Sequence, residues 1–415
     1  MISRFHFNIS FYENFKNIIK IFFHKKNNYD DSLKNELSKI YSSKSFYFFD
    51  HGRTALYEAL EQIKKKTDKR KILINSLTLF EIVNIIIYAG FKPVFIDNKE
   101  NSFETEINLN NLKDSLNEVA AIILTHLNGV NLNILNLKDQ IDNHNKKNQK
   151  IYLIEDCAVA LGSKIENKNV GLFGDFSFLS FNIMKNITSY TGGVLIDNNK
   201  EISLLDSKNY KELSKFYILK KIFFVFTIQL VNSRLFFPIF FKLVKYSYKY
   251  SFNFFLKKYR TDFEVRIEKK MPSKFLYFMH SFQKKLLLSQ FKDFKIKQLD
   301  RIKKSEIYFN GLKDLKIINF PQTEFNEKNI FLEFPIICQS KKVKDELFDY
   351  LMNKKIDVKN YYYKNCSDEQ VYRSYFVECI NSRNISNNIL MLPVHQGINL
   401  SHQNLIIKEI INFFH

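Results

Sequence analysis

Between residues 44 and 196, short apolar runs alternate with segments in which apolar residues recur at helical spacing. The runs predict strands and the spaced segments predict helices. Because apolar strands that alternate with helices are typical of a mostly parallel sheet covered on both faces, this pattern predicts an α/β fold. The expected strands are 45–49, 71–74, 94–96, 120–124, 151–154, 176–181 and 194–196, and the expected helices are 52–66, 80–89 and 135–147.

The pattern changes twice further along the chain. Residues 200–270 are dense in Phe and Lys, and residues 271–415 return to a globular pattern with mixed helices and strands. In this last part we expect a long amphipathic helix at 281–310 and a terminal helix at 404–414. The chain is therefore predicted to have an N-terminal arm, a large α/β domain, a Phe/Lys-rich insertion and a small C-terminal α+β domain, at 1–43, 44–205, 206–270 and 271–415.

One segment of the insertion, residues 222–241, is long and apolar enough to suggest a membrane helix. Arg234 and Pro238 interrupt it, and a central Arg costs roughly 2.5–3.5 kcal/mol on insertion scales. A single span would also place the parts before and after it on opposite sides of a membrane. The flanking lysines favour an interfacial or re-entrant helix pair on anionic headgroups, and a buried helical hairpin or a subunit interface remains the alternative.

Composition narrows the classes of partner. The net charge of +20 comes from 63 Lys and Arg against 43 Asp and Glu, and the lysines are spread along the chain. Spread lysine is typical of a solvated surface, and no zinc-finger spacing or RNA-binding aromatic motif is present, so we do not expect a nucleic acid partner. The four cysteines are far apart, which favours a reduced compartment without disulfides or a cysteine metal site. Because the first 26 residues lack the pattern of a signal peptide, we expect a cytoplasmic location, with peripheral contact to the inner face of the membrane.

Polar residues with chemical potential fall at the expected strand ends. Asp156 and His126 each end or follow an apolar run, and in parallel sheets the carboxyl ends of the strands line the ligand crevice. Lys185 follows the expected strand 176–181, and a lysine partly removed from water becomes a nucleophile for an aldehyde. Each residue has an ordinary alternative: Asp156 as a helix N-cap or magnesium ligand, Lys185 as an exposed cation, and His126 as a structural hydrogen-bonder. His395, after a Leu-Pro pair, has the same ambiguity as His126.

A second candidate feature is an anion cup at residues 52–54. Gly52, Arg53 and Thr54 lie between an expected strand and an expected helix. Glycine lets the backbone approach an anion closely, and a helix N-terminus presents free N–H groups at the positive end of its dipole. Ser180 could add a hydroxyl to the same anion. An ordinary helix start and a turn serine are the alternatives.

Taken together, these residues resemble the pyridoxal phosphate (PLP)-dependent nucleotide-sugar aminotransferases of the DegT/StrS type, which have fold type I, like aspartate aminotransferase. No single motif is decisive, but the set occurs in family order and covers the chain from about residue 46 to its end. The matching stretches are 52–56, 90–97, 125–129, 154–163, 171–175, 180–187, 192–193 and 392–395.

The resemblance implies a role for each of these residues. Lys185 would be the Schiff-base lysine and Asp156 the partner of the pyridinium nitrogen, within a PLP-binding domain at 44–205. The amino group would pass from glutamate to a nucleotide-linked keto-sugar, for surface polysaccharide or glycan synthesis, in a homodimer with its sites at the subunit interface. Related sugar dehydratases have His in place of this lysine, so Lys185 favours transamination. The cofactor phosphate would be held by Gly52, Arg53, Thr54 and Ser180, with a weak match of Asn209 to a loop asparagine that reaches the neighbouring subunit's phosphate.

Three positions depart from the family pattern. Val159 stands where the family commonly has Gln, Asn182 where it often has His, and Leu79, or Phe80 in its place, where a ring-stacking aromatic is expected. These departures, with the insertion, motivate an alternative: a catalytically altered member that acts as a membrane-associated scaffold or regulator. We expect Asn182, His126 and His395 to have substrate-binding or structural roles, and we expect no metal ion at the site.

Overall fold

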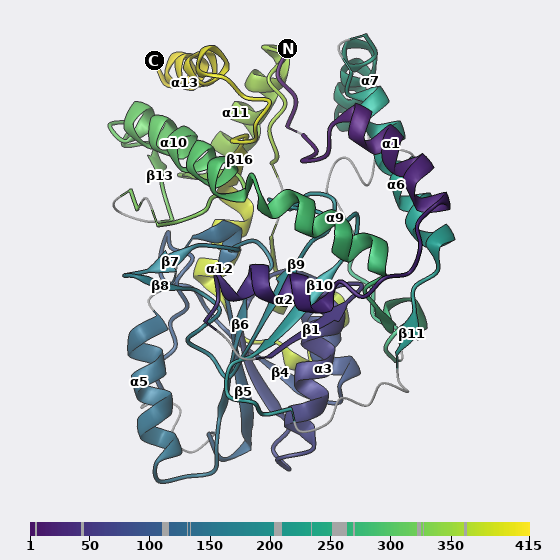
Figure 1. Cartoon of the computed structure of the whole chain (residues 1–415). Coiled ribbons are helices and arrows are strands. Elements are labelled where there is room, and N and C mark those ends of the chain that lie inside the picture. The colour runs from purple at the N-terminus through teal and green to yellow at the C-terminus, as the bar shows by residue number, and fades with distance from the viewer. Residues whose placement is uncertain are drawn as a thin grey trace.

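The computed structural model describes the whole chain except residues 5, 43–44, 110–115, 131, 133, 203–209, 234, 251–263, 269, 322–324, 327 and 361–362, and leaves the side chains of 248–250 undescribed. The described chain folds around a nine-stranded sheet in the order β11-β12-β1-β10-β9-β6-β5-β2-β4 (Figure 1). Strands β4, β2, β5, β6 and β9 run parallel, whereas β10 and β1 are antiparallel to their neighbours, which confirms the predicted mostly parallel α/β sheet. The strands are β1 (Ser45–Phe49), β2 (Lys71–Asn75), β4 (Lys92–Ile96), β5 (Val119–Thr125), β6 (Tyr152–Asp156), β9 (Phe176–Ser180), β10 (Gly193–Asp197), β11 (Lys211–Glu212) and β12 (Tyr277–Phe278).

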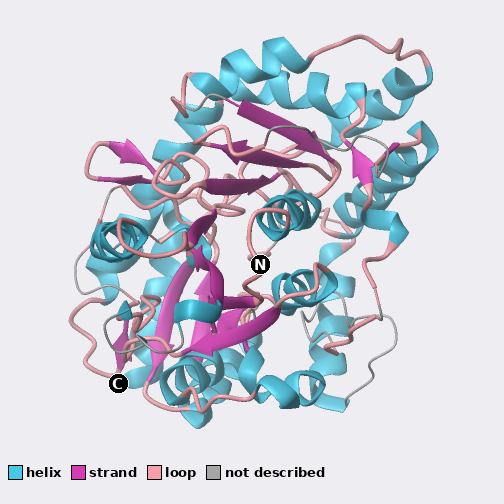
Figure 2. Ribbon diagram, turned by 90° about the horizontal axis from the view of Figure 1, so that it is seen from below, coloured by secondary structure: helices cyan, strands magenta, loops and turns pink. Residues whose placement is uncertain are grey.

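Helices cover both faces of this sheet, so its central strands are apolar on both sides (Figure 2). Ile72 and Ile74 of β2 pack with α3 (Gly52–Lys64) and α4 (Phe80–Tyr88), while Leu73 between them packs on the opposite face with α5 (Ile134–Asn145). The same face of the sheet that α5 covers is covered near β1 and β10 by α2 (Asp30–Ser38) and α9 (Ser281–Phe291). Side chains of neighbouring strand residues point to opposite faces, and here both faces are core.

The C-terminal part has a small antiparallel sheet of its own, in the order β13-β14-β16. Its strands are β13 (Ile318–Asn319), β14 (Phe334–Cys338) and β16 (Ile389–Leu392), and its helices are α10 (Phe294–Leu312), α11 (Lys341–Asn353), α12 (Ile380–Asn388) and α13 (Leu400–Phe414). Two-stranded pairs are formed by β3 (Leu77–Thr78) with β15 (Lys364–Asn365) and by β7 (Lys164–Ile165) with β8 (Lys168–Asn169). Short 3₁₀ turns occur at Leu127–Gly129, Ser273–Phe275, Cys366–Asp368 and Gln370–Tyr375.

The single long helix expected at 281–310 was wrong, because the structure has two helices there, α9 and α10. Each packs against a different part of the molecule: Lys284 of α9 forms an ion pair with Asp30 of α2, and the Gln403 side chain of α13 donates to the Lys304 carbonyl of α10 at 2.7 Å. The chain changes direction at residues 292–293, where neither Gly nor Pro marks a break. Tertiary packing therefore sets the boundary between α9 and α10, and the periodicity of apolar residues contains no information about that packing.

The apolar run 222–241 is also divided between two helices, α6 (Lys215–Val231) and α7 (Phe237–Tyr250). Among the described helices, none combines the length and the apolar character needed to cross a membrane. Ile218, Ile222 and Val225 of α6 are buried in a cluster that includes Ile21 of α1 (Phe11–Phe22). The segment is thus a helix pair in which α6 packs on α1, while α7 buries Phe237, Phe241 and Val244 in the main core.

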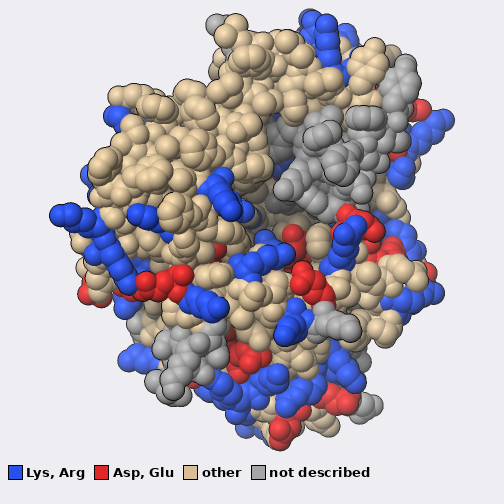
Figure 3. Space-filling view, turned by 90° about the vertical axis from the view of Figure 1, so that its right-hand side faces the viewer, with Lys and Arg blue, Asp and Glu red and all other residues tan. Residues whose placement is uncertain are grey.

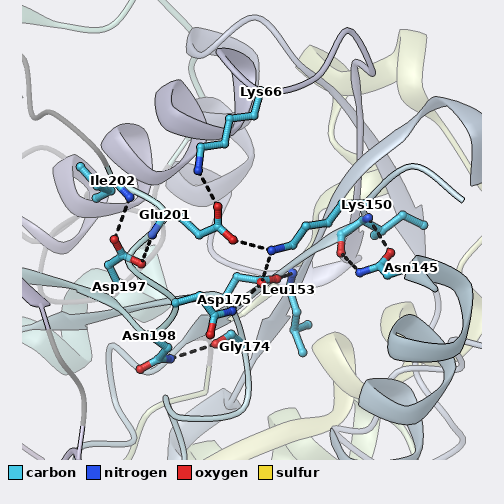
Figure 4. A network of polar contacts seen from close by, with 12 residues as sticks. Lys66, Asn145, Lys150, Leu153, Gly174, Asp175, Asp197, Asn198, Glu201 and Ile202 are labelled. Carbon is cyan, nitrogen blue, oxygen red and sulfur yellow. Dashed lines mark hydrogen bonds and ion pairs between the residues drawn. The ribbon is translucent and has the colours of Figure 1, made fainter.

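A network of ion pairs and hydrogen bonds locks the edge of the large sheet where β6 and β9 begin (Figure 4). Lys150 pairs with Asp175 at 2.8 Å and with Glu201 at 2.5 Å, and Glu201 also pairs with Lys66 at 2.5 Å. The Asp175 carboxylate accepts the Leu153 N–H at 2.8 Å. Because these charges satisfy one another, we interpret this edge as structural, and the opposite edge, where β6 and β9 end, is where the chemistry is expected.

Candidate active site

The carboxyl ends of the parallel strands bring the predicted residues to one edge of the sheet. Asp156, at the end of β6, pairs in register with Thr125 of β5, so His126 follows directly beside it. Ser180, at the end of β9, pairs with Gly193 at the start of β10. These placements follow from strand direction alone, since β10 runs antiparallel and therefore begins where β9 ends.

Asp156 and Lys185 influence each other's protonation across this edge. Burial raises the pKa of Asp156 to about 6, although its hydrogen bond from the Ala158 N–H at 3.0 Å and the charges of Lys185 and His126 act to lower the pKa. Burial likewise lowers the pKa of Lys185 to about 8, and the charge of Asp156 opposes that shift. A lysine with this pKa is partly neutral near pH 8, so it can act as a nucleophile and as a base.

The loop that carries Lys185 is fixed by backbone contacts. The Asn182 side chain accepts the Ile183 N–H at 2.8 Å, and the Asn182 carbonyl accepts the Lys185 N–H at 3.0 Å. Asn182 therefore forms the turn before the lysine. Of the two roles expected for Asn182, substrate-binding or structural, these contacts correspond to the structural one. From the N-terminal arm, the Asn8 side chain donates to the Lys185 carbonyl at 2.5 Å.

The cup predicted at the start of α3 lies against Ser180. A Cβ added to Gly52 would sit 3.1 Å from both the Ser180 Cβ and the Leu179 carbonyl oxygen. The Thr54 and Ala55 amides already donate to the His51 carbonyl, which leaves the amides of Gly52 and Arg53 as those that the helix start does not use. The Thr54 hydroxyl donates to the Phe275 carbonyl at 2.5 Å, and the role of Thr54 at an anion stays a prediction.

Gly193 makes this cup possible by allowing two backbones to approach each other closely. A Cβ at Gly193 would lie 2.2 Å from the His51 carbonyl carbon and 2.3 Å from the Gly52 nitrogen. We therefore expect Gly193→Ala to displace the start of α3 and to weaken PLP binding by about tenfold or more, measured by titrating the apoprotein with PLP. Gly311→Ala is the matched control, since there a new Cβ meets only the side chain of Ile407. Equal PLP affinity of the Gly193 variant and the wild type would show that the cup does not hold the cofactor.

Glu155 points away from Asp156 and has a structural role. Its carboxylate accepts the N–H groups of Gly171, Phe173 and Gly174, each at 2.7 Å, and contacts the His126 Nε2 at 3.2 Å. His126 is fully buried in this contact. The side chains of His126, Glu155 and Cys157 lie close together, and all three are of types that can bind a metal ion. The Glu155 carboxylate, however, already accepts three backbone N–H groups, which stabilise its negative charge.

His395 is held in the C-terminal part by backbone groups. Its Nε2 contacts the Ser3 carbonyl at 3.0 Å, its Nδ1 accepts the Gly397 N–H at 3.2 Å, and its ring stacks on His6. Burial, followed by the charge of His6, lowers the pKa of His395 to about 3. These contacts correspond to the structural alternative for His395. The other match made from the resemblance, Asn209, lies outside the described residues.

Three charged residues near Lys185 were not found from the sequence. Lys359 and Glu333, both buried in the C-terminal part, form an ion pair, and both act on the pKa of Lys185, as does Glu81 in the first turn of α4. The C-terminal part therefore contributes charged groups that act on the pKa of Lys185. The sequence carries no spacing or motif that relates these residues to Lys185.

A hollow of about 480 Å³ lies elsewhere, between the C-terminal sheet and α12. Its lining includes Asn381, Asn384 and Ser340, but neither Lys185 nor Asp156. Amide side chains make up most of this lining. The candidate active site is therefore assigned to Lys185 and Asp156, whose pKa values are both shifted.

Comparisons with known proteins agree with this geometry. The model of the DegT/DnrJ/EryC1/StrS aminotransferase family matches residues 13–207 and 260–411. A GDP-perosamine synthase of Vibrio cholerae is 31% identical over 172 residues, which are 41% of this chain and 45% of that protein, so the chain spans less than half the length of this relative. A UDP-4-amino-4,6-dideoxy-N-acetyl-beta-L-altrosamine transaminase of Campylobacter jejuni is 27% identical over 333 residues, 79% of this chain and 75% of that protein.

Solved structures show the same fold at low identity. PseC of Helicobacter pylori, an aminotransferase involved in the biosynthesis of pseudoaminic acid, superposes with a TM-score of 0.69 at 19% identity, covering 97% of this chain and 96% of that one. The sugar aminotransferase CalS13 of Micromonospora echinospora superposes with a TM-score of 0.72 at 12% identity, covering 99% of this chain and 100% of that one. At these identities the likeness establishes the architecture alone.

Proposed function

Because the chain belongs to the DegT/DnrJ/EryC1/StrS aminotransferase family, we propose that it is a PLP-dependent aminotransferase that moves an amino group from glutamate to a nucleotide-linked keto-sugar. The observation that carries the proposal is the pairing of Lys185 with Asp156 at the carboxyl edge of the sheet, where burial lowers the pKa of the lysine to about 8 and raises the pKa of the carboxyl to about 6 while each charge stabilises the other. The acceptor class is supported by relatives named as a GDP-perosamine synthase and an altrosamine transaminase, which suggests a role in glycan synthesis.

The residues at this edge fit PLP. A buried carboxyl, a lysine with a lowered pKa and a backbone cup beside a serine match the pyridine nitrogen, the aldehyde and the phosphate of the cofactor. When bound, PLP supplies an electron sink for bonds at the carbon next to the transferred nitrogen. In this proposal the phosphate is held by the amides of Gly52 and Arg53 and by the hydroxyl of Ser180.

The protein's own groups then manage protons and orientation. The Asp156 carboxylate would keep a proton on the pyridine nitrogen, while the Lys185 Nζ would take a proton from one carbon and return it to another. Lys359 and Glu333 act on the pKa of Lys185 from the C-terminal part, and we propose that Lys359 helps to orient anionic substrates there. We also propose a homodimer, as the family resemblance implies, with PLP held in the part at 44–205.

The direct test is amino transfer. Purified protein with PLP and glutamate should release more than one equivalent of 2-oxoglutarate per active site only when a suitable nucleotide-linked keto-sugar is supplied from a panel that varies nucleotide and keto position. Absence of PLP binding would overturn the proposal. Tight PLP binding without transfer to any acceptor would instead support the scaffold or regulator alternative that Val159 and Asn182 motivate.

We expect Asp156→Asn to lower turnover by about 100-fold or more, because an amide cannot hold the proton on the ring nitrogen. The same variant should change the stability of the apoprotein. Since the pKa of Asp156 is raised from 3.8 to about 6 on folding, this carboxyl costs stability as the pH rises through that window, and Asn removes the cost. Urea unfolding should show the variant gaining about 3 kcal/mol over the wild type between pH 4 and pH 7.

A difference in stability between Asp156→Asn and the wild type that does not depend on pH would contradict the assignment of Asp156 as a buried carboxyl with a raised pKa. Asp139→Asn is a control for the substitution itself, because Asp139 lies on the outer part of α5. It should change neither turnover nor the pH dependence of unfolding.

A further inference from the structure

Helices α1, α6 and α7 lie near one another at one side of the molecule (Figure 1). Each of them exposes large apolar side chains. Helices α1 and α6 contact each other through the rings of Phe11 and Phe226, whose centroids are 4.6 Å apart, and α7 continues from α6. We call the exposed side of α1, α6 and α7 the outer face. Its exposed side chains include Phe15, Phe22, Phe223, Phe236, Ile239 and Leu243.

Helix α1 buries two asparagines beside Ile21 and exposes large apolar side chains. Asn14 and Asn17 are buried, where they bond to the Gln229 side chain and the Tyr190 hydroxyl at 3.0 and 3.1 Å. Phe15 and Phe22 are 49% and 51% exposed. A helix that only packs on a core shows the reverse arrangement, so this pattern indicates a second, apolar environment outside the described chain.

Helix α7 is apolar on two sides. Phe241 and Val244 are buried, whereas Ile239 and Leu243 are 64% and 57% exposed. Contiguous exposed apolar surface of this kind is rare on monomeric soluble proteins and marks a site of protein or membrane contact. The family match leaves residues 208–259 unmatched, so α6 and α7 lie outside the part of the chain that the family model describes.

The charge of this segment distinguishes between two possible partners of the outer face, a second copy of the chain and a lipid surface. Residues 213–261 contain ten Lys and Arg and no Asp or Glu. Among the described side chains of this segment, the exposed charged residues are Lys215, Lys220, Lys242 and Lys245. Figure 3, which faces this side, shows a broad uncharged area with scattered Lys and Arg in its upper half, while most of the acidic residues in view lie below. A symmetric dimer through the outer face would set this basic surface against itself, which repels, whereas anionic headgroups complement it.

We propose that the outer face of α1, α6 and α7 docks on an anionic bilayer, with the helices lying in the interface and none of them crossing it. The apolar side chains enter the headgroup boundary, and Lys242 and Lys245, both exposed on α7, contact anionic headgroups. The inner side of α1 packs on the loop that follows Lys185, through Asn17 and Tyr190. Docking therefore holds the candidate active site at the membrane surface, and the proposal does not depend on which reaction occurs there.

The test is vesicle flotation of the full chain. We expect the wild type to float with phosphatidylcholine vesicles that contain phosphatidylglycerol, to float poorly with phosphatidylcholine alone, and to be released by high salt. The triple variant Leu235→Ser/Ile239→Ser/Leu243→Ser should lower the partition coefficient by about tenfold or more, and Lys242→Glu/Lys245→Glu should do so mainly on the anionic vesicles. Because all five side chains are exposed, these changes should leave the circular dichroism spectrum and melting temperature unchanged.

Matched controls come from other helices. Ile296→Ser/Leu299→Ser/Leu400→Ser removes equally exposed apolar residues, and Lys313→Glu/Lys316→Glu reverses two exposed lysines. Both controls should float like the wild type. Failure of the wild type to bind anionic vesicles at low salt would overturn the proposal. So would a loss of oligomer size in the triple variant without loss of flotation, since that result would assign the outer face to a second copy of the chain.

Discussion

Lys185→Ala should abolish the visible absorbance of lysine-bound PLP and reduce amino transfer by about 10⁴-fold or more, because the substitution removes both the covalent attachment point and the proton carrier. The absorbance spectrum of the purified, PLP-treated protein and the release of 2-oxoglutarate measure the two effects. In the wild type, PLP attachment to the apoprotein should accelerate as the pH rises through about 8, the pKa of Lys185, because only the neutral amine attacks the aldehyde.

Two further variants separate chemistry from structure. Lys185→Arg keeps a cation beside Asp156 but cannot form the covalent bond, so it should bind PLP without the lysine-bound spectrum. Lys303→Ala removes an exposed lysine from α10 and should leave both readouts at wild-type values. A wild-type spectrum in Lys185→Ala would show that another amine holds the cofactor.

The second large effect concerns stability. We expect Glu155→Ala to destabilise the fold by about 4–6 kcal/mol, since it leaves the N–H groups of Gly171, Phe173 and Gly174 buried without their acceptor. This loss is comparable with the whole stability of an ordinary domain, so little folded protein should remain. The free energy of unfolding, from urea titration of the protein that stays in solution, checks the value.

Glu155→Gln provides the graded comparison. Its one amide oxygen can still accept N–H groups, while its NH₂ group faces donors, so its stability should lie between those of Glu155→Ala and the wild type. Glu306→Ala, which changes an exposed carboxylate on α10, should stay within about 0.5 kcal/mol of the wild type. Equal stability of Glu155→Ala and Glu306→Ala would show that the three N–H groups find other acceptors.

The sequence was sufficient for the seven long strands of the large sheet and for the place of Asp156 at a strand end. Strands buried on both faces appear as apolar runs, and Asp156 could be placed at a strand end because β6 is such a run. Alternation along β6 also accounts for Glu155 facing away from Asp156. The order of the motifs then indicated the family, which the family match confirmed over most of the chain.

Long-range contacts could not be predicted in this way. Glu333 and Lys359 belong to the C-terminal part and act on Lys185 from there. No local sequence pattern indicates that such distant segments lie close together in the fold. The break between α9 and α10 has the same origin, since each helix follows its own partner. The inverted face of α1 was missed because a helix with Asn on its inner side and Phe on its outer side has the same periodicity as an ordinary amphipathic helix.

The N-terminal arm has a practical consequence for recombinant protein. Ile2 pairs with Ile356, Arg4 forms a buried ion pair with Asp357 at 2.5 Å, and Asn8 holds the Lys185 carbonyl, so these first residues thread between the C-terminal part and the reactive loop. We therefore expect an affinity tag or fluorescent fusion at Met1 to disturb the contacts of Ile2, Arg4 and Asn8. His415, exposed after the last turn of α13, is the better attachment point for purification and for tracking the protein in cells.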